Sequence, residues 1–195
     1  ETEMDESFEY ALDFYKDYDR EGQTLSARIS YEESEDDELE DIEDFASFPL
    51  ISESIFEKVS NIDFQKRLLG QVDFIYPIDK ETEFEFGYRG SFLERETDYD
   101  VSFLTGNIFV SDIGLSNIFN YKESVNSLYT QFGKKFDKLS ALFGLRYENS
   151  RQEINQKTTN QFEIKKYSNL FPTLNLAYEF SSQESLTFGY SKRIR

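Results

Sequence analysis

Apolar and polar residues alternate along most of the chain, as in the segment Thr82–Gly90, which reads TEFEFGYRG. Aromatic residues occupy every second position there, and charged residues lie between them: Phe84, Phe86 and Tyr88 alternate with Glu83, Glu85 and Arg89. Successive side chains of a β-strand point to opposite faces of the sheet. The alternation therefore predicts a strand with one apolar face and one polar face.

The same period of two recurs throughout the chain, whereas helical periodicity is hard to find. We expect about eight strands in four hairpins, each hairpin closed by a turn of a few residues. The predicted pairs are Ser7–Tyr18 with Gln23–Glu33, Asp63–Tyr76 with Glu81–Thr97, Phe119–Gly133 with Lys138–Ser150, and Leu170–Phe180 with Glu184–Arg195.

Long connections are expected between these hairpins, at Ser34–Ile62, Asp98–Ile118 and Arg151–Asn169. Long structureless loops are uncommon in compact soluble domains. Short turns at one rim and long loops at the other are typical of bacterial outer-membrane barrels. Most of the predicted strands also reach the roughly 9–11 residues that a tilted strand needs to cross a membrane.

A single alternating strand, taken alone, favours a soluble sheet with a dry core over a membrane barrel. Eight such strands in succession favour the barrel, and so do aromatic residues near strand ends, whose polar tips suit the headgroup level. These are Tyr76, Tyr88, Tyr147, Tyr178 and Tyr190. We expect an all-β fold, an antiparallel up-and-down transmembrane β-barrel segment, with residues 1–195 forming part of one barrel domain.

Composition narrows the possible functions. The formal net charge is −18, from 39 acidic and 21 basic residues, which excludes nucleic acid as an expected partner because phosphate binding needs a basic surface. The chain has no cysteine and no histidine, so thiolate chemistry and histidine-based catalysis or metal binding are ruled out. We expect neither an enzyme nor a cofactor.

The longest apolar run is the five residues FIYPI, too short for a transmembrane helix, and no secretory leader is visible. The chain opens without an initiator methionine and stops within a predicted strand. These features indicate a fragment of a larger protein.

Two segments near the end of the chain resemble the barrel of TonB-dependent outer-membrane receptors, and specifically the outer-membrane β-barrel family common in Bacteroidetes. They read SLYTQFGKKFDKLSALFGLRYENS and YSNLFPTLNLAYEFSSQESLTFGYSKRIR. The features that carry the resemblance are GLRYE at Gly144–Glu148, LFP at Leu170–Pro172 and the final strand at Tyr190–Arg195. Earlier hairpins fit the same pattern more loosely.

The resemblance implies a receptor in the outer membrane of a Gram-negative bacterium, which imports a scarce nutrient with energy delivered by TonB. Its expected partners are outer-membrane lipid, a small nutrient ligand, and TonB acting through the plug of the full-length protein. A family barrel has about 22 strands around its plug, so eight strands are roughly a third of it. The sequence shows no plug, TonB-contacting segment or terminal aromatic strand end, so this segment alone is not expected to couple to TonB.

The segment Glu32–Asp44 has ten acids in thirteen residues and no base. Its carboxylates, Glu35, Asp36 and Asp37 in particular, are candidates for binding Ca²⁺. The segment lacks the spacing of an ordered calcium loop, however, and a solvated, self-repelling loop at the outer rim, the least ordered part of the fold, is the other interpretation.

Four arginines are expected on the polar, lumen-facing side of the strands: Arg28, Arg89, Arg146 and Arg193. They are candidate contacts for an anionic ligand or for the plug. The alternative is that they pair with lumen glutamates across neighbouring strands.

Two other classes of protein remain open from the sequence. A small stand-alone eight-stranded barrel would have a structural or adhesive role in the membrane. A soluble β-sandwich binding module would place the two apolar faces of two sheets against each other.

Overall fold

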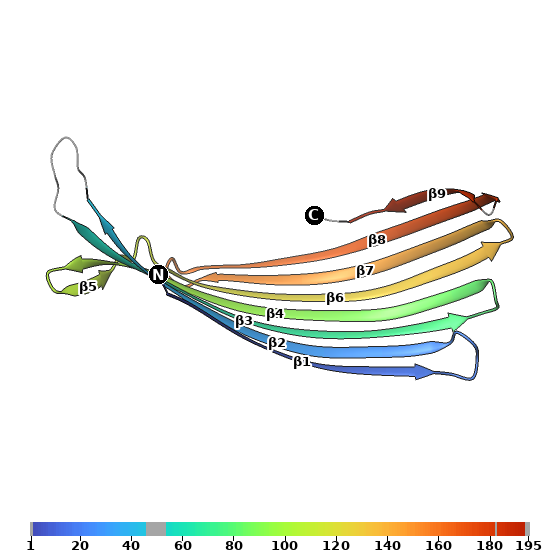
Figure 1. The fold of residues 1–195 in the computed structure, drawn as a ribbon, viewed down its shortest axis with the longest axis horizontal. Coiled ribbons are helices and arrows are strands. Elements are labelled where there is room, and N and C mark those ends of the chain that lie inside the picture. Colours follow the sequence, from blue (N-terminus) through green and yellow to red (C-terminus); the bar gives the residue numbers. More distant parts are fainter. Residues whose placement is uncertain (1, 46–53, 182, 194–195) are drawn as a thin grey trace.

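The computed structural model describes residues 2–45, 54–181 and 183–193. Within these residues the secondary structure is β throughout, and nine strands form a single sheet (Figure 1). The strands are β1 (Thr2–Asp17), β2 (Thr24–Asp44), β3 (Ile55–Pro77), β4 (Thr82–Thr105), β5 (Ile108–Ser111), β6 (Asn117–Phe136), β7 (Leu139–Gln156), β8 (Gln161–Ser181) and β9 (Glu184–Ser191). The described residues contain no helix long and apolar enough to cross a membrane.

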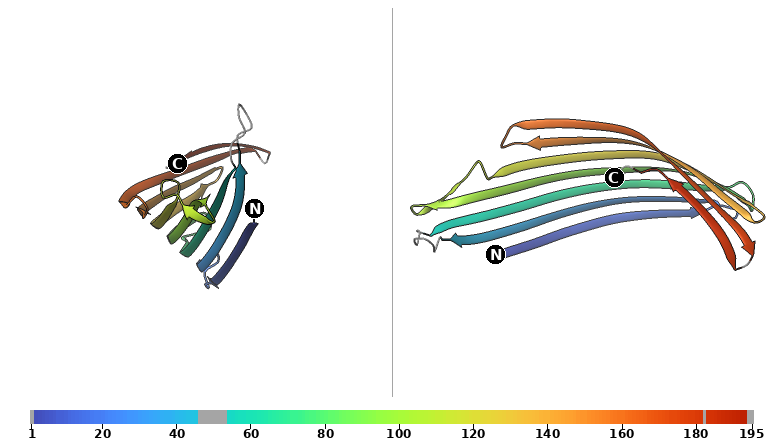
Figure 2. Two further views of the ribbon diagram at one scale, coloured as in Figure 1. Left: turned by 90° about the vertical axis from the view of Figure 1, so that its left-hand side faces the viewer. Right: turned by 90° about the horizontal axis from the view of Figure 1, so that it is seen from above.

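The sheet is an antiparallel meander in which each long strand pairs with the next one along the chain. Its order is β1-β2-β3-β4-β6-β7-β8-β9, while the short β5 pairs only with the end of β4. The sheet is curved and open, with β1 and β9 at its edges (Figure 2). The predicted fold class is therefore confirmed, and the alternative of a two-sheet sandwich is wrong because the described strands form one layer.

The two faces of the sheet differ as the alternation predicts. On β7, Phe143 and Tyr147 are 54% and 44% exposed, whereas the residues between them on the other face, Gly144 and Arg146, are less accessible. We call the two sides the apolar face and the polar face, and the polar face lies on the concave side of the sheet. The convex, apolar face carries most of the exposed aromatic and aliphatic side chains of the strands.

Very little of this chain is buried as a core. Among the described residues, Val101 is the one large apolar side chain that is buried, at 3% exposure. Soluble monomers rarely expose an apolar surface that runs over many adjacent strands. The apolar face is thus a surface that needs a non-aqueous neighbour.

The long connections expected from the sequence are largely wrong, because most of their residues are paired strand. The acidic segment Glu32–Asp44 forms the outer part of β2; it pairs with β3 along its whole length and with β1 as far as Leu39. The segment Arg151–Asn169 is a hairpin with its turn at Lys157–Asn160. Alternation fades there because both faces of the projecting strands meet water, although backbone pairing continues.

Charge pairing helps to hold part of this acidic segment in the sheet. Three of its ten acids lie opposite bases of β3: Glu32 lies 3.6 Å from Arg67, Glu33 lies 3.8 Å from Lys66, and Asp41 lies 3.5 Å from Lys58. Opposite charges on neighbouring strands stabilise a sheet by a few tenths of a kcal/mol to about 1 kcal/mol each. The prediction of a self-repelling loop did not include these partners on β3.

The turns at the opposite end are short and locally stabilised. In the β3–β4 turn the Asp79 carboxylate accepts a hydrogen bond of 2.8 Å from the Glu81 backbone N–H. This bond, with further hydrogen bonding to Thr82, lowers the pKa of Asp79. The strand positions next to these turns are fixed by such local contacts.

Candidate functional site

The polar face is the candidate functional surface, because cross-strand register assembles its side chains into rows. One such row runs across four strands, from Asp73 on β3 through Gly87 on β4 and Tyr129 on β6 to Arg146 on β7. Each residue in the row lies directly opposite the next one. A row of this kind follows from pairing register, which the sequence of a single strand does not contain.

Tyr129 spans this row. Its hydroxyl donates a hydrogen bond to the Asp73 carboxylate, and its ring lies where a side chain at Gly87 would be. The guanidinium carbon of Arg146 lies 5.7 Å from the centre of the same ring, within the range of a cation–π contact. The ring is therefore held from both sides.

Arg146 is fully engaged by neighbouring groups. Its Nη2 donates to the Ser127 hydroxyl at 2.7 Å and to Glu148 Oε2 at 3.0 Å. Ser127 is 1% exposed, so the hydrogen bond satisfies a buried hydroxyl. Arg146 thus pairs with a lumen glutamate, but with one on its own strand β7 and not across neighbouring strands as the second interpretation had it.

The other three arginines are dispersed. Arg28 lies 3.5 Å from both Glu9 and Asp13 on β1. Arg89 is exposed in the middle of β4 and makes no ion pair with the described residues, and Arg193 is exposed just after β9. The structure does not gather the four arginines into one anion site, and it leaves Arg89 as the inward arginine most accessible to a ligand.

The acidic candidates are separated by the alternation of the strand. Asp36 lies on the polar face, opposite Asp5 and Asp63, whereas Glu35 lies opposite Phe64 on the other face. A small hollow of about 300 Å³ lies beside Asp36 and Asp37, and its acid Asp63 forms an ion pair with Arg95. Over the described ranges, no group of three or more acidic residues is placed to hold a metal ion.

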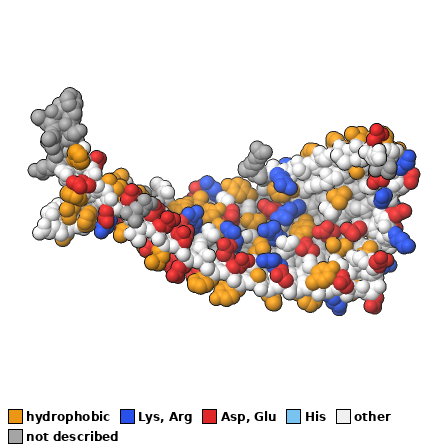
Figure 3. All heavy atoms as spheres, viewed as in Figure 1, with side chains coloured by type: hydrophobic (Ala, Val, Ile, Leu, Met, Phe, Trp, Pro, Cys, Tyr) orange, Lys and Arg blue, Asp and Glu red, His pale blue; other side chains and the backbone are white. Residues whose placement is uncertain are grey.

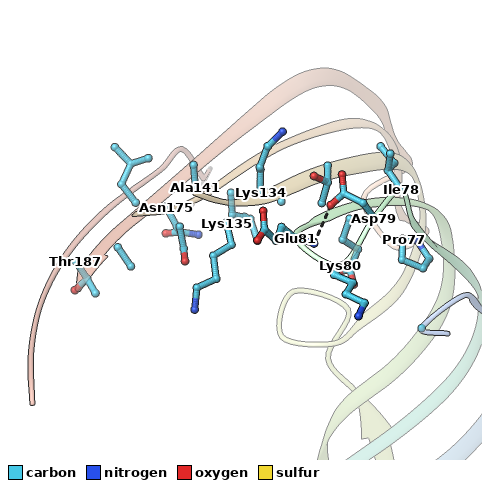
Figure 4. A pocket seen from close by; sticks show the side chains of 18 of the residues that line it. Pro77, Ile78, Asp79, Lys80, Glu81, Lys134, Lys135, Ala141, Asn175 and Thr187 are labelled. Atoms are coloured by element: carbon cyan, nitrogen blue, oxygen red, sulfur yellow. Dashed lines mark hydrogen bonds between the residues drawn. The ribbon is translucent and has the colours of Figure 1, made fainter. Parts of the chain in front are cut away.

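A larger hollow, of about 1190 Å³, lies on the concave side next to the short turns. Lys135, Asn175 and Thr187 point into this side of the sheet, and Lys134 points away from it (Figure 4). The wall of the hollow on β6, β8 and β9 is built from small inward residues such as Gly133, Ala177 and Gly189. Sequence reasoning did not identify this hollow, although small residues at consecutive inward positions were a signal for it.

Charge is unevenly distributed over the surface. Acidic side chains gather toward the end of the sheet where the long hairpins project, while basic side chains are frequent along the middle of the strands (Figure 3). A wet, charged concave face and an apolar convex face define a transmembrane β-barrel wall, in which charged residues face the aqueous interior and apolar residues face lipid.

The comparisons with known proteins agree with this architecture. Residues 16–195 match the family model described as "Outer membrane protein beta-barrel family". The chain belongs to this family, and it is located in the outer membrane of a Gram-negative bacterium. Among curated protein sequences none matches the chain.

Solved structures with a similar fold are receptors and transporters. The siderophore receptor PiuA from Acinetobacter baumannii has a TM-score of 0.69 at 11% identity, with 97% of this chain and 32% of PiuA covered. The ferric citrate transporter FecA has a TM-score of 0.61 at 12% identity, with 92% and 26% covered. The RagAB peptide transporter has a TM-score of 0.56 at 15% identity, with 97% and 23% covered.

At these identities the likeness concerns the fold. The chain spans about a quarter to a third of the length of these three structures. It is an outer-membrane β-barrel chain that resembles TonB-dependent receptors and transporters.

Proposed function

We propose that this chain forms part of the barrel wall of a TonB-dependent importer, which carries a scarce nutrient across the outer membrane. The observation that carries the proposal is the continuous polar concave face, which runs across all the long strands and backs onto a lipid-facing apolar surface. Such a wall encloses water. A water-filled interior bounded by strands is a route for a solute.

On this proposal residues 1–195 are one sector of a larger barrel. FecA and PiuA match 92% and 97% of this chain, and the matched parts are 26% and 32% of FecA and PiuA. The edge strands β1 and β9 each have one side on which a further strand could pair. The remaining wall, and the plug through which TonB acts, belong to the full-length protein.

The ligand enters from the side of the projecting hairpins and passes along the polar face. Within that face Arg89 is the proposed contact for a ligand with negative charge, because its guanidinium is exposed while that of Arg146 is engaged with Ser127 and Glu148. Arg28 is a weaker candidate, since Glu9 and Asp13 share its charge. PiuA, FecA and RagAB are described with different cargo, so the fold alone supports a scarce nutrient rather than one compound.

Uptake by cells tests this proposal. A strain lacking the gene is compared with its parent and with a strain lacking TonB, using labelled ferric siderophore, cobalamin, oligosaccharide and peptide in turn. We expect one class of compound to accumulate in the parent and to be lost equally in both deletion strains. Equal uptake of all four compounds by the parent and by the strain lacking the gene would contradict the proposal.

A further inference from the structure

Three cations lie on the outward, apolar side of β6, β7 and β8, farther from the short turns than the apolar residues Leu128, Tyr147 and Leu170. Arg151 on β7 lies directly opposite Lys166 on β8, and Lys122 on β6 lies opposite Glu153, two residues along β7 from Arg151. All three side chains are exposed. We call Lys122, Arg151 and Lys166 the outer cation cluster.

The residues between the cluster and the short turns indicate how deep the cluster lies relative to the lipid. Two residues nearer the short turns on β7 and β8, Asn149 donates a hydrogen bond of 2.9 Å to the Ser168 hydroxyl. The hydroxyl of Tyr147, which lies next below Asn149 on the same face, also points to Ser168, at 3.4 Å. A tyrosine whose ring lies in the apolar surface and whose hydroxyl points to an amide row marks a membrane–water interface.

The neighbouring strands repeat this arrangement. On β4 the Tyr88 hydroxyl donates a hydrogen bond of 2.7 Å to Asn126 on β6, which lies opposite Asn149 on β7. The absence of a side chain at Gly90 leaves room for this bond, because a Cβ there would lie 2.7 Å from the Tyr88 hydroxyl. Tyrosine hydroxyls on two strands thus reach the same polar row.

The cluster therefore lies just past the interface. A strand rises about 3.3 Å per residue, so Arg151 and Lys166 lie about 7 Å beyond the polar row. Short turns face the periplasm and long hairpins face the outside in bacterial barrels, and the cluster is on the side of the long hairpins. Its side chains extend to the depth of the headgroups of the outer leaflet.

The β7–β8 hairpin near the cluster carries a net positive charge, whereas the chain as a whole is strongly negative. The chain carries −18 overall, but the β7–β8 hairpin between Arg151 and Lys166 has four bases and two acids: Arg151, Lys157, Lys165 and Lys166 with Glu153 and Glu163. Arg151 lies 2.6 Å from Glu153 and Lys122 lies 2.9 Å from Glu94, while Lys166 forms no ion pair with the described residues. Exposed ion pairs are weak, so an anionic group can compete for both of the paired cations.

We propose that the outer cation cluster binds the phosphate-bearing headgroup of an outer-leaflet glycolipid. Arg151 supplies a planar guanidinium that can donate two hydrogen bonds to one phosphate, and Lys166 and Lys122 supply the neighbouring charges. The lipid chains lie along the apolar face below Tyr147. This inference depends on the location of the chain in the outer membrane and is independent of the cargo that the protein imports.

The test uses the full-length protein in detergent, with diphosphoryl lipid A in mixed micelles as the probe and binding followed by native mass spectrometry. The double variant Arg151→Gln/Lys166→Gln is compared with Lys165→Gln. Lys165 is the matched control because it neighbours Lys166 in sequence but points to the polar face, opposite Gln152. A charge-retaining variant, Arg151→Lys/Lys166→Arg, shows whether loss of folding explains any loss of binding.

Because basic side chains near an anionic lipid surface each strengthen binding, loss of two of them in the double variant is expected to weaken lipid A binding about 10- to 30-fold. The control and the charge-retaining variant are expected to bind within about twofold of the parent protein. Equal weakening by Lys165→Gln, or no weakening by the double variant, would overturn the proposal.

Two further arms identify the ligand. Lipid A from which both phosphates have been removed is expected to bind as weakly to the parent protein as diphosphoryl lipid A binds to the double variant. Millimolar inorganic phosphate is expected not to displace diphosphoryl lipid A, since free phosphate lacks the chains that lie on the apolar face. Strong binding of the dephosphorylated lipid, or displacement by free phosphate, would contradict a phosphorylated lipid as the ligand.

Discussion

Tyr129 on β6 donates a hydrogen bond to Asp73 on β3, across the whole width of β4. The bond passes over Gly87, which lies opposite both residues in the pairing register. Three strands are thereby connected by one side chain, and its ring also meets the guanidinium of Arg146 at 5.7 Å. The contact fixes the spacing of β3, β4 and β6 on the polar face.

Substituting Gly87 by alanine is expected to destabilise the barrel. The new Cβ would collide with the Tyr129 ring, and overpacking of this kind costs about 1–3 kcal/mol. The measurement is urea unfolding of the full-length protein in lipid vesicles, followed by the difference in gel mobility between folded and unfolded barrel. Gly133→Ala is the control, since no described atom lies within 4 Å of a Cβ at Gly133; equal effects of the two substitutions would contradict the role of the ring.

Removing the Tyr129 hydroxyl alone is expected to destabilise the barrel by an amount similar to that of Gly87→Ala. Tyr129→Phe keeps the ring over Gly87 and removes one of the two hydrogen bonds that Asp73 accepts, since Gln71 Nε2 still donates to Asp73 Oδ2 at 2.8 Å. A hydrogen bond to a charged group contributes about 1.5–3 kcal/mol. The same unfolding measurement on Asp73→Asn and on the double variant Tyr129→Phe/Asp73→Asn gives the coupling free energy between the two side chains. If the two substitutions add without coupling, the hydrogen bond does not contribute to stability.

Arg89 and Arg146 are expected to respond differently to substitution by glutamine. Arg146→Gln removes the partner of Glu148 and of the buried Ser127 hydroxyl, so stability should fall by about 1–3 kcal/mol. Arg89→Gln should leave stability within about 0.5 kcal/mol of the parent and reduce uptake of an anionic cargo. Unfolding in vesicles and labelled uptake by cells are measured on the same two variants, and the reverse assignment of effects would show that Arg89 is structural.

A charge on the apolar face is expected to be far more costly than a charge on the polar face. Arginine on the lipid side of a barrel costs about 2–4 kcal/mol at mid-membrane depth, so Phe86→Arg should impair insertion into vesicles. Glu85→Arg, one residue away on the polar face, should insert normally, because Glu85 lies close to the acids Asp73 and Glu83. Equal insertion of both variants would mean that the apolar face does not contact lipid.

The β3–β4 turn is expected to lose stability in acid. The pKa of Asp79 is lowered by its hydrogen bonds to Glu81 and Thr82, so the folded state binds a proton less readily at Asp79 than the unfolded chain does. The stabilisation is then complete above the ordinary pKa of an aspartate and is lost as the pH falls through the lowered value. Asp79→Asn removes this titration, so the difference in unfolding free energy between parent and variant should shrink as the pH falls; a constant difference would contradict the assignment.

The faces of the membrane-spanning strands could be predicted from sequence because lipid and water impose a strict period of two. The apolar positions Phe84, Phe86 and Tyr88 and the polar positions between them lie as the alternation predicts. The projecting halves of β2, β3 and β8 were missed, because water on both faces removes the period while the backbone stays paired. The small strand β5 was missed for the same reason.

The cross-strand contacts of the candidate site could not be predicted from the sequence. Nothing in the order of residues shows that Tyr129 lies opposite Gly87, since register depends on the turn and on the pairing of neighbouring strands. The inward direction of Arg146 could be predicted, but its engagement with Ser127 and Glu148 could not. Which arginines are paired and which are accessible is a property of the assembled sheet.

The projecting hairpins have one more consequence. β2 has 21 residues and β3 has 23, so each is about 70 Å or more in length, about twice what roughly 9–11 residues need to cross the bilayer. The outer halves of β2 and β3 are paired with each other and linked by cross-strand ion pairs, so they do not form a flexible loop. A nutrient, antibody or bacteriophage that approaches from the medium therefore first meets a rigid, strongly acidic hairpin that extends beyond the outer surface of the membrane.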